Sequence, residues 1–203
     1  MARLVVGFDL DMTLVDSRPG IRASCDALAR ETGTFVDTEL VLSRLGAPLE
    51  VELANWFPAE RVDAAADRYR TIYARLGVPG TLAMPGAHEA LAAVRRASGT
   101  SLVVTAKDTA NARACVEHVG LDVDVVEGLV WGAGKGDVLA RHGAHVFVGD
   151  SPPDVLGART AGAVPVGVTT GPHDAQELRE AGADVVLTTL HDFAAWLETS
   201  TNA

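Results

Sequence analysis

The chain has 203 residues, of which 48% are hydrophobic and 22% are charged, as in an ordinary soluble globular protein. Its 17 basic and 27 acidic residues give a net charge of −10, which argues against a nucleic acid or an anionic membrane as a partner. The first residues, MARLVVGFDLD, lack a signal-peptide pattern, and no apolar run is long enough to span a bilayer. The sequence therefore predicts a cytoplasmic protein, and it does not indicate an oligomeric state.

Short apolar runs alternate with helical patterns along most of the chain. The expected strands are 4–8, 101–105, 145–148, 164–168 and 184–187, with a weaker candidate at 123–130. The expected helices are 88–97, 110–119, 153–161 and 174–181. Because the strand runs are continuously apolar, they are typical of parallel strands covered on both faces. The alternation predicts an α/β fold with a doubly wound, Rossmann-like parallel sheet.

Residues 16–84 interrupt this alternation. The segment contains no convincing strand, and apolar side chains recur at helical spacing on one face between Val62 and Leu76. We predict a core domain of residues 1–15 and 85–203, with a small helical cap domain of residues 16–84 inserted after the first strand. The polar tail, 198–203, is expected to be frayed.

Two cysteines, Cys25 and Cys115, lack metal-ligand spacing. We expect both to be reduced, apolar and buried or half-buried, because isolated cysteines in such a chain behave as small hydrophobic residues.

Chemically active side chains follow the expected strands at the points where the strands end. In open parallel sheets, ligands bind beyond the carboxyl ends of the strands, so these positions are informative. The residues are Asp9, Asp11 and Thr13 after the first strand, Thr105 and Lys107 after the second, Lys135 before a later helix, and Asp150, Ser151 and Asp154 after the strand at 145–148.

This set of residue types suits phosphoryl chemistry. Two carboxylates as close as Asp9 and Asp11 repel each other unless a cation or a proton lies between them. Mg²⁺ prefers such oxygen ligands, a carboxylate can attack phosphorus, and a second carboxyl group can transfer a proton. An ammonium and a hydroxyl can hold phosphoryl oxygens.

These motifs resemble those of the haloacid dehalogenase superfamily, in order and over nearly the whole chain. FDLDMT resembles the D-x-D-x-T motif, VVTAK the second motif, Lys135 the third-motif lysine, and GDSPPD the fourth motif. TAK is similar to the T-N-K of the phosphoglycolate phosphatase-like branch, and RLGAPLE to its G-x-P-L segment. The chain departs from the pattern at Met12, where relatives often have glycine, and after Lys135, where many have proline.

The resemblance implies a Mg²⁺-dependent phosphohydrolase of a small phosphomonoester, phosphoglycolate-like or a sugar phosphate, that works through an aspartyl-phosphate. Asp9 would attack phosphorus, and Asp11 would protonate the leaving oxygen and then activate water. Thr105 and Lys135 would hold the phosphoryl oxygens. The implied metal ligands are Asp9, Asp11 (through its backbone carbonyl) and Asp150. Thr13, Ser151, Asp154 and Lys107 would support the site.

Lysine is rare in this chain, since 15 of the 17 basic residues are arginines and the only lysines are Lys107 and Lys135. A retained lysine indicates a need for a compact ammonium, so Lys107 is the rival of Lys135 for the third-motif position. Two arginines of the expected cap, Arg18 and Arg44, are candidates for binding a substrate carboxylate, although exposed arginines are usually only solvated.

Two alternatives remain open at this point. A phosphosugar mutase of the β-phosphoglucomutase type would use the same aspartyl-phosphate, and the core motifs do not separate it from a phosphatase. A non-catalytic phosphate-binding module could share the fold, but binding alone does not require the second acid, Asp11.

Overall fold

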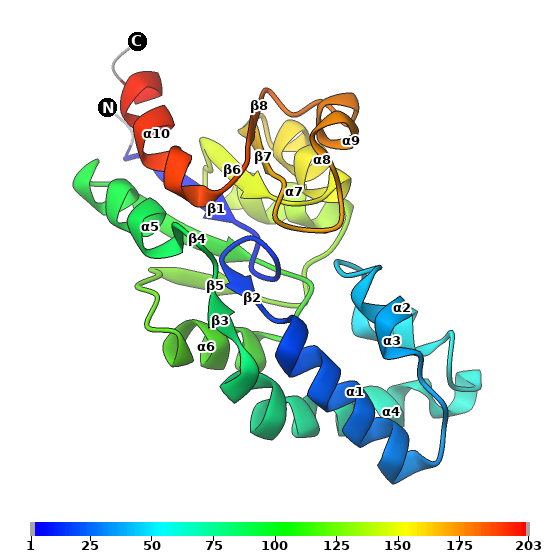
Figure 1. The fold of residues 1–203 in the computed structure, drawn as a ribbon. Coiled ribbons are helices and arrows are strands. Elements are labelled where there is room, and N and C mark those ends of the chain that lie inside the picture. Colours follow the sequence, from blue (N-terminus) through cyan, green and yellow to red (C-terminus); the bar gives the residue numbers. More distant parts are fainter. Residues whose placement is uncertain (1–2, 202–203) are drawn as a thin grey trace.

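The computed structural model describes residues 3–201 and contains a six-stranded parallel sheet (Figure 1). The strands are β1 (Val5–Phe8), β4 (Thr100–Val104), β5 (Val125–Glu127), β6 (Val146–Gly149), β7 (Val164–Val168) and β8 (Val185–Leu187). Their order in the sheet is β5-β4-β1-β6-β7-β8. This confirms the predicted fold class, and the strand ends differ from the expected ones by a few residues.

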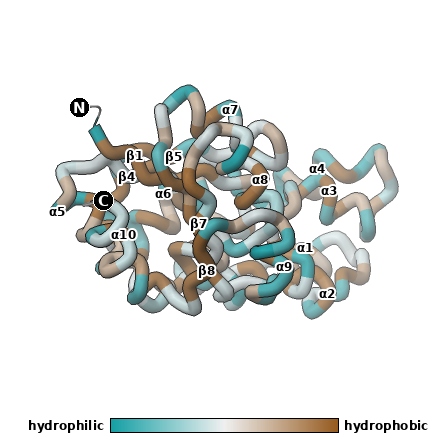
Figure 2. Tube along the Cα trace, turned by 90° about the horizontal axis from the view of Figure 1, so that it is seen from above, coloured by the Kyte–Doolittle hydropathy of each residue, from teal (hydrophilic) through white to brown (hydrophobic). Residues whose placement is uncertain are grey.

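Strand β1 lies between β4 and β6, with Val6 paired with Ser101 on one side and with Val146 on the other. The chain winds outward from β1 in both directions, so β1 and β6 flank the point where the connections diverge. A ligand is expected in the crevice beyond their carboxyl ends. Figure 2 shows the strands as hydrophobic segments in the interior of the core.

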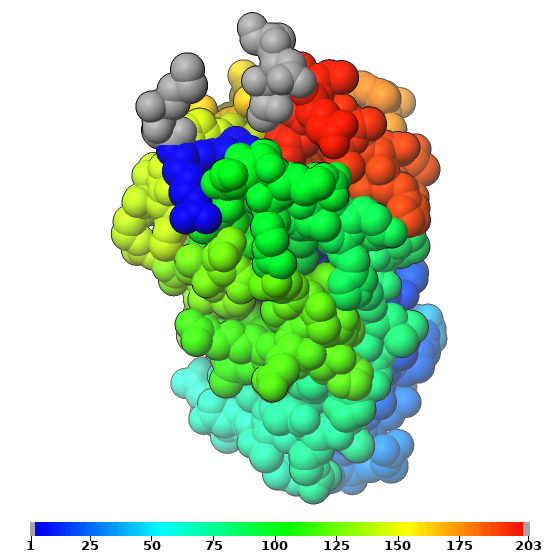
Figure 3. All heavy atoms as spheres, turned by 90° about the vertical axis from the view of Figure 1, so that its left-hand side faces the viewer, coloured from blue at the N-terminus to red at the C-terminus, as the bar shows by residue number. Residues whose placement is uncertain are grey.

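Helices cover both faces of the sheet. On one face, α5 (Ala87–Arg96), α6 (Thr109–His118) and α10 (Phe193–Thr201) pack against β1, and the rings of Phe8 and Phe193 meet edge to face with centroids 5.4 Å apart. Figure 3 shows α5 and α10 side by side on the surface. On the other face, α7 (Ala133–Arg141) and α8 (Pro152–Thr160) pack on β4 and β6, next to α9 (Ala175–Glu180).

The segment between β1 and α5 is mostly helical and has a hydrophobic cluster of its own, which includes Leu28, Phe57 and Ile72. Its helices are α1 (Arg18–Thr32), α2 (Thr38–Leu42), α3 (Leu49–Leu53) and α4 (Ala59–Ile72), followed by a π-helix (Tyr73–Gly77) and a 3₁₀ turn (Val78–Gly80). These helices lie together below the sheet in Figure 1.

The expectation that this segment contains no strand was wrong. Strands β2 (Val15–Asp16) and β3 (Leu82–Ala83) pair antiparallel where the chain leaves and re-enters the core. A two-residue strand is too short to show a hydrophobic period, so only the pairing reveals it.

The expectation of a frayed tail was wrong for residues 198–201, which belong to α10, whereas 202–203 lie outside the described residues. Helix α10 is held by apolar contacts, because Phe193 and Leu197 are almost fully buried. Both cysteines are free and buried, as expected. Within residues 3–201, no helix is long and apolar enough to cross a membrane.

Close packing at the start of α1 generates a stability prediction. A Cβ added at Gly20 would overlap the carbonyl oxygen of Gly77 in the π-helix. Helix propensity favours alanine over glycine by up to about 1 kcal/mol, but a clash with backbone must be relieved by moving the helix. We expect Gly20→Ala to destabilise the protein by about 1–3 kcal/mol in urea unfolding.

The matched control is Gly134→Ala in α7, where an added Cβ has no neighbour nearer than Val130 Cγ1 at 3.7 Å. Here the same substitution should be neutral or stabilising. Equal effects at the two glycines would contradict the close approach of α1 to the π-helix.

Candidate active site

The end of β1 aims the first two acids of the site. Asp9 follows β1 directly, its backbone N–H donates to the Val148 carbonyl oxygen at 2.8 Å, and its side chain is buried. The chain then turns sharply at Met12, whose φ of 62° lies in the left-handed region. This turn explains why the resembling family often has glycine here, and it carries the chain from Asp11 straight to β2.

The end of β6 supplies the next group. Asp150 follows β6 and accepts a hydrogen bond from Thr13 Oγ1 at 3.0 Å. Ser151 precedes α8, and its Oγ donates to Asp154 Oδ2 at 2.6 Å, so Asp154 is held against the start of that helix. Thr13 and Ser151 thus orient acids of the site, in keeping with the supporting positions expected for them.

Lys135 lies in the first turn of α7, not just before the helix as the sequence indicated. Its buried Nζ donates to Asp9 Oδ1 at 2.7 Å and to Asp154 Oδ1 at 2.6 Å. Burial lowers the pKa of Lys135, but the carboxylates of Asp154 and Asp9 oppose this and the net direction is upward, so the side chain is an ammonium. The Lys135 ammonium therefore joins Asp9, at the end of β1, to Asp154, in the first turn of α8.

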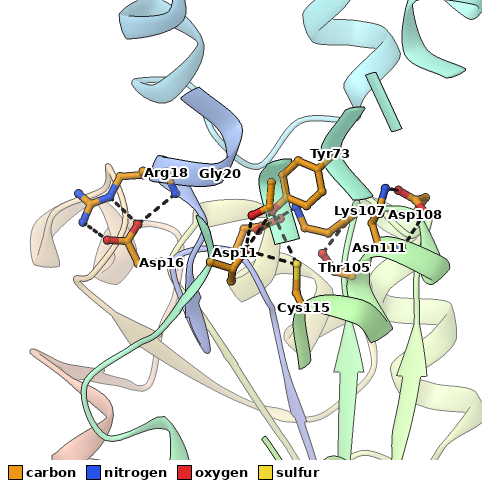
Figure 4. A network of polar contacts seen from close by, with 12 residues as sticks. Asp11, Asp16, Arg18, Gly20, Tyr73, Thr105, Lys107, Asp108, Asn111 and Cys115 are labelled. Atoms are coloured by element: carbon orange, nitrogen blue, oxygen red, sulfur yellow. Dashed lines mark hydrogen bonds and ion pairs between the residues drawn. The ribbon is translucent and has the colours of Figure 1, made fainter. Parts of the chain in front are cut away.

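The second lysine pairs with the other acid of the first motif. Lys107 Nζ lies 3.1 Å from Asp11 Oδ1 and 4.2 Å from the centre of the Tyr73 ring, which comes from the π-helix (Figure 4). Burial lowers the pKa of Lys107, whereas Asp11 and Tyr73 raise it, and the net direction is upward. Thr105 is buried in the same turn, and its Oγ1 accepts from the Lys107 backbone N–H at 3.2 Å.

Three carboxylates could hold a metal ion. Ligand oxygens of Asp9, Asp150 and Asp154 lie within 4.8 Å of one another. Burial raises the pKa of Asp9 to about 7, with Lys135 opposing the shift and Asp154 adding to it. Burial likewise raises the pKa of Asp150. Charges held this close at a buried site repel unless a cation or a proton lies between them, and an all-oxygen donor set fits Mg²⁺.

Two of the three expected metal ligands, Asp9 and Asp150, belong to this cluster, and Asp154 is its third member. Asp11 was expected to bind through its backbone carbonyl, and its carboxylate lies against Lys107. Because both oxygens of Asp154 already accept hydrogen bonds, from Lys135 and Ser151, Asp9 and Asp150 are the carboxylates best placed to bind a metal.

Asp9, Asp11 and Asp150 lie on the floor of a cavity that is open to solvent. The core contributes Asp9, Asp11, Thr105, Lys107, Lys135, Asp150 and Ser151 to its lining, and the helical segment contributes apolar residues from α1 to α4 together with Arg44, Glu52 and Arg70. The structure thus gathers at one cavity every strand-end residue named from the sequence except Thr13 and Asp154, which lie behind it.

The two arginines that are candidates for substrate binding lie in different places. Arg44 lines the cavity and forms an ion pair with Glu52 at 2.6 Å. Arg18 does not line it; it pairs with Asp16 at 2.7 Å (Figure 4). It borders a separate, smaller recess. Its expected role in substrate binding therefore has no support in the geometry.

Sequence reasoning missed several residues of the lining, among them Arg70, Asn111 and Trp131. Asn111 Nδ2 donates to the Arg70 carbonyl oxygen at 3.2 Å and so links α6 to α4. None of these residues lies in a motif, and the only signal for Trp131 was its position in the loop between a strand and Lys135.

The site combines a parallel sheet, acids at the ends of β1 and β6, a lysine between these acids and a helical segment that covers them. This combination defines the class of haloacid dehalogenase-like hydrolases. A family model described as haloacid dehalogenase-like hydrolase matches residues 6–159, and a second, HAD-hydrolase-like, matches residues 135–193. The chain belongs to this family, in its phosphatase-like branch.

Individual relatives agree with this assignment. The chain is 34% identical to the probable phosphatase IndB of Dickeya dadantii, over 95% of this chain and 92% of that protein. It is 32% identical to a phosphoglycolate phosphatase of Rhodospirillum rubrum, over 94% and 89%. A haloacid dehalogenase-like hydrolase from Streptococcus pneumoniae superposes with a TM-score of 0.83 at 24% identity, covering 96% of this chain and 98% of that one, which shows the shared fold.

The carboxylate cluster generates a binding prediction. Chelator-treated protein should melt at a higher temperature after addition of millimolar Mg²⁺, because the ion binds the folded state and relieves repulsion among the acids. At 100 times Kd the gain is about 2.7 kcal/mol. Differential scanning calorimetry measures it.

Asp150→Asn should abolish most of this gain and should itself stabilise the metal-free protein, since it removes one of the repelling charges. Asp63→Asn, at an exposed position of α4, is the control and should change neither quantity. A melting temperature indifferent to Mg²⁺ in all three proteins would refute the metal assignment.

Proposed function

We propose that the protein is a Mg²⁺-dependent phosphohydrolase that cleaves a small phosphomonoester, phosphoglycolate-like or a sugar phosphate, through an aspartyl-phosphate. The observation that carries the proposal is the buried Lys135–Asp9 pair on the floor of the cavity, with Asp150 beside it and Asp11 two residues further on. The assignment to the phosphatase-like branch supports it.

Asp9 is the proposed nucleophile. Lys135 holds its Oδ1, and among the described residues Oδ2 has no hydrogen-bond partner. A fixed carboxylate with one free oxygen can form the new bond to phosphorus while the bond from phosphorus to the leaving oxygen breaks. The product is an acyl phosphate on Asp9, which water then hydrolyses to release inorganic phosphate.

Asp11 is the proposed general acid and base. It lines the same cavity, so it can donate a proton to the leaving alkoxide and afterwards take one from the attacking water. Lys107 pairs with its Oδ1 and, through the Tyr73 ring, ties its position to the helical segment. This pairing gives Lys107 a role in orienting the acid.

Thr105 and Lys135 are the proposed phosphoryl-binding groups. The Thr105 hydroxyl and the Lys135 ammonium both line the cavity, and Thr105 is held by its backbone bond to Glu127 at 3.0 Å. Donors fixed in this way stabilise the negative charge of the phosphoryl oxygens without reorganising during the reaction. Mg²⁺, held by Asp9 and Asp150, would supply further charge neutralisation.

We also propose the division into a core of residues 1–15 and 85–203 and a cap of residues 16–84. The separate hydrophobic cluster of α1–α4 supports it, and so does the short β2–β3 pair, through which both connections run. A cap placed over the cavity excludes bulk water and contacts the leaving group.

The nucleophile can be tested by Asp9→Asn. The amide is a near-isostere that can still accept from Lys135 but has no nucleophilic charge, so we expect turnover to fall by at least about 1,000-fold with the fold preserved. Steady-state release of inorganic phosphate and circular dichroism are the measurements. Asp63→Asn serves again as the exposed control, and wild-type turnover in Asp9→Asn would exclude the mechanism.

The two lysines should differ in importance. Lys135 holds the nucleophile directly, so Lys135→Ala should lower kcat by about 100- to 1,000-fold, the scale of losing one charge-stabilising donor. Lys107 acts only through Asp11, and we expect Lys107→Ala to cost roughly 10-fold.

Because an unpaired buried acid destabilises a protein, Lys135→Met, which keeps the volume, should accompany the alanine variant, with both checked by thermal melting. If folded Lys107→Ala lost more kcat than folded Lys135→Met, the roles of the two lysines would have to be exchanged.

A further inference from the structure

The cations of the cavity leave no free positive charge for the leaving group. Each of the four that line it already has a carboxylate partner: Arg44 with Glu52, Arg70 with Glu50 and Asp67, Lys107 with Asp11, and Lys135 with Asp9 and Asp154. Five carboxylates line the same cavity, namely Asp9, Asp11, Glu52, Asp108 and Asp150. The proposed metal would offset part of this negative charge, but the substrate phosphate would add to it again, so a second anionic group would meet no unpaired cation among the described residues.

On the cap side of the cavity, Glu52 neutralises the positive charge of Arg44. Its side chain is 14% exposed, and its Oε1 accepts from Arg44 Nη2 at 2.6 Å and from Trp56 Nε1 at 2.9 Å. Two donors thus hold the carboxylate in place beside Arg44. A substrate carboxylate approaching Arg44 would have to compete with Glu52 and would be repelled by it.

The cavity also has an aromatic side chain at its rim, that of Trp131, which is 46% exposed. The Trp131 backbone carbonyl oxygen accepts from the Gly134 N–H at 3.1 Å, but its indole has no hydrogen bond or ring contact with the described residues. The other two tryptophans are engaged, Trp56 with Phe35 and Glu52, and Trp196 with Phe193.

The loop that carries Trp131 is fixed to the floor of the site. The backbone N–H groups of Leu129 and Val130 donate to the carbonyl oxygens of Lys107 and Thr105, both at 2.9 Å. Leu129 has a φ of 59°, which non-glycine residues rarely adopt, and an added Cβ at Gly128 would lie 2.6 Å from the Lys107 carbonyl oxygen. Such local strain is retained where the surrounding structure requires that backbone path, and here the path places Trp131 at the rim.

The cap side of the cavity is largely apolar. It presents Ile21, Val41, Leu45, Leu49, Tyr69 and Tyr73. An apolar lining with an open aromatic face at its rim binds flat or broad apolar groups, because burying that surface is favourable and an indole stacks on rings. A two-carbon acid would leave most of this surface in contact with water.

We propose that the substrate is the phosphate monoester of an uncharged alcohol that carries a ring, with Trp131 stacking on the ring and Glu52 excluding a carboxylate from Arg44. This inference rests on the proposed function. It narrows the range of substrates from phosphoglycolate-like esters and sugar phosphates to esters whose leaving group is neutral and carries a ring.

The proposed exclusion of a substrate carboxylate is tested with two substrates of similar size, 2-phosphoglycolate and 2-hydroxyethyl phosphate. The wild type should show at least a 10-fold higher kcat/KM for the neutral ester. Glu52→Gln, which frees Arg44, should raise kcat/KM for 2-phosphoglycolate several-fold relative to kcat/KM for 2-hydroxyethyl phosphate. Glu60→Gln, at an exposed position of α4, is the matched control and should shift neither value.

The proposed stacking of Trp131 on a substrate ring is tested with benzyl phosphate and ethyl phosphate, whose alcohols are of similar acidity. The wild type should prefer the benzyl ester by at least 10-fold in kcat/KM, and Trp131→Ala should remove most of this preference while Trp131→Phe retains part of it. Leu156→Ala removes an exposed apolar side chain outside the cavity and should leave the preference intact.

The outcomes separate the two proposals. If none of the four esters is hydrolysed with Mg²⁺ present, the proposed function itself fails and this inference fails with it. If esters are hydrolysed but 2-phosphoglycolate is preferred, or Trp131→Ala leaves the benzyl preference unchanged, the phosphatase stands and the inference about its leaving group is overturned.

Discussion

The structure of the site depends on one buried cation, the Lys135 ammonium, which lies between the carboxylates of Asp9 and Asp154 at 2.7 and 2.6 Å. Without it, three acids from the ends of β1 and β6 and from the first turn of α8 would converge at a buried site, at a large electrostatic cost. The position of the ammonium is in turn set by close packing. Gly136 and Gly157 allow α7 and α8 to approach each other, since a Cβ at Gly136 would lie 2.9 Å from the Thr160 side chain. Packing of two helices on one face of the sheet thus decides where the charge lies.

A second lysine connects the end of β4 to the π-helix of the segment that we propose as a cap. Lys107 lies against Asp11 and under the Tyr73 ring, and the Tyr73 hydroxyl lies 3.5 Å from Thr81 Oγ1 and 3.7 Å from Cys115 Sγ. Asp11, the π-helix and α6 therefore share one buried group of polar contacts. Tyr73 belongs to the proposed cap, so these contacts join the proposed cap to the carboxylate of the proposed acid.

The residues that follow the strands could be assigned to one site because the sequence signals for them are local. Apolar runs mark strands buried on both faces, and the carboxyl ends of parallel strands meet at one edge, so acids and lysines that directly follow the runs converge. Asp9, Thr105 and Asp150 could be assigned to one site on this ground alone, before any distance was known. Short elements were not predictable in this way: β2 and β3 have two residues each, and α10 follows from the burial of Phe193 and Leu197, not from a polar-looking tail.

The sequence by itself determined the fold class, the helical segment after β1 and the set of residues at the cavity floor, because each of these follows from a periodicity or from a motif a few residues long. Only the tertiary structure decided which charges pair. Asp154 joins Asp9 and Asp150, and Lys135 and Lys107 pair with Asp9 and Asp11. Arg44 pairs with Glu52, and Arg18 lies away from the cavity. Most of these pairings join residues far apart in the chain, such as Lys135 with Asp9 and Lys107 with Asp11. The energy of an ion pair changes steeply over a few ångströms, and those distances are set by how helices pack on the sheet, which no local pattern specifies.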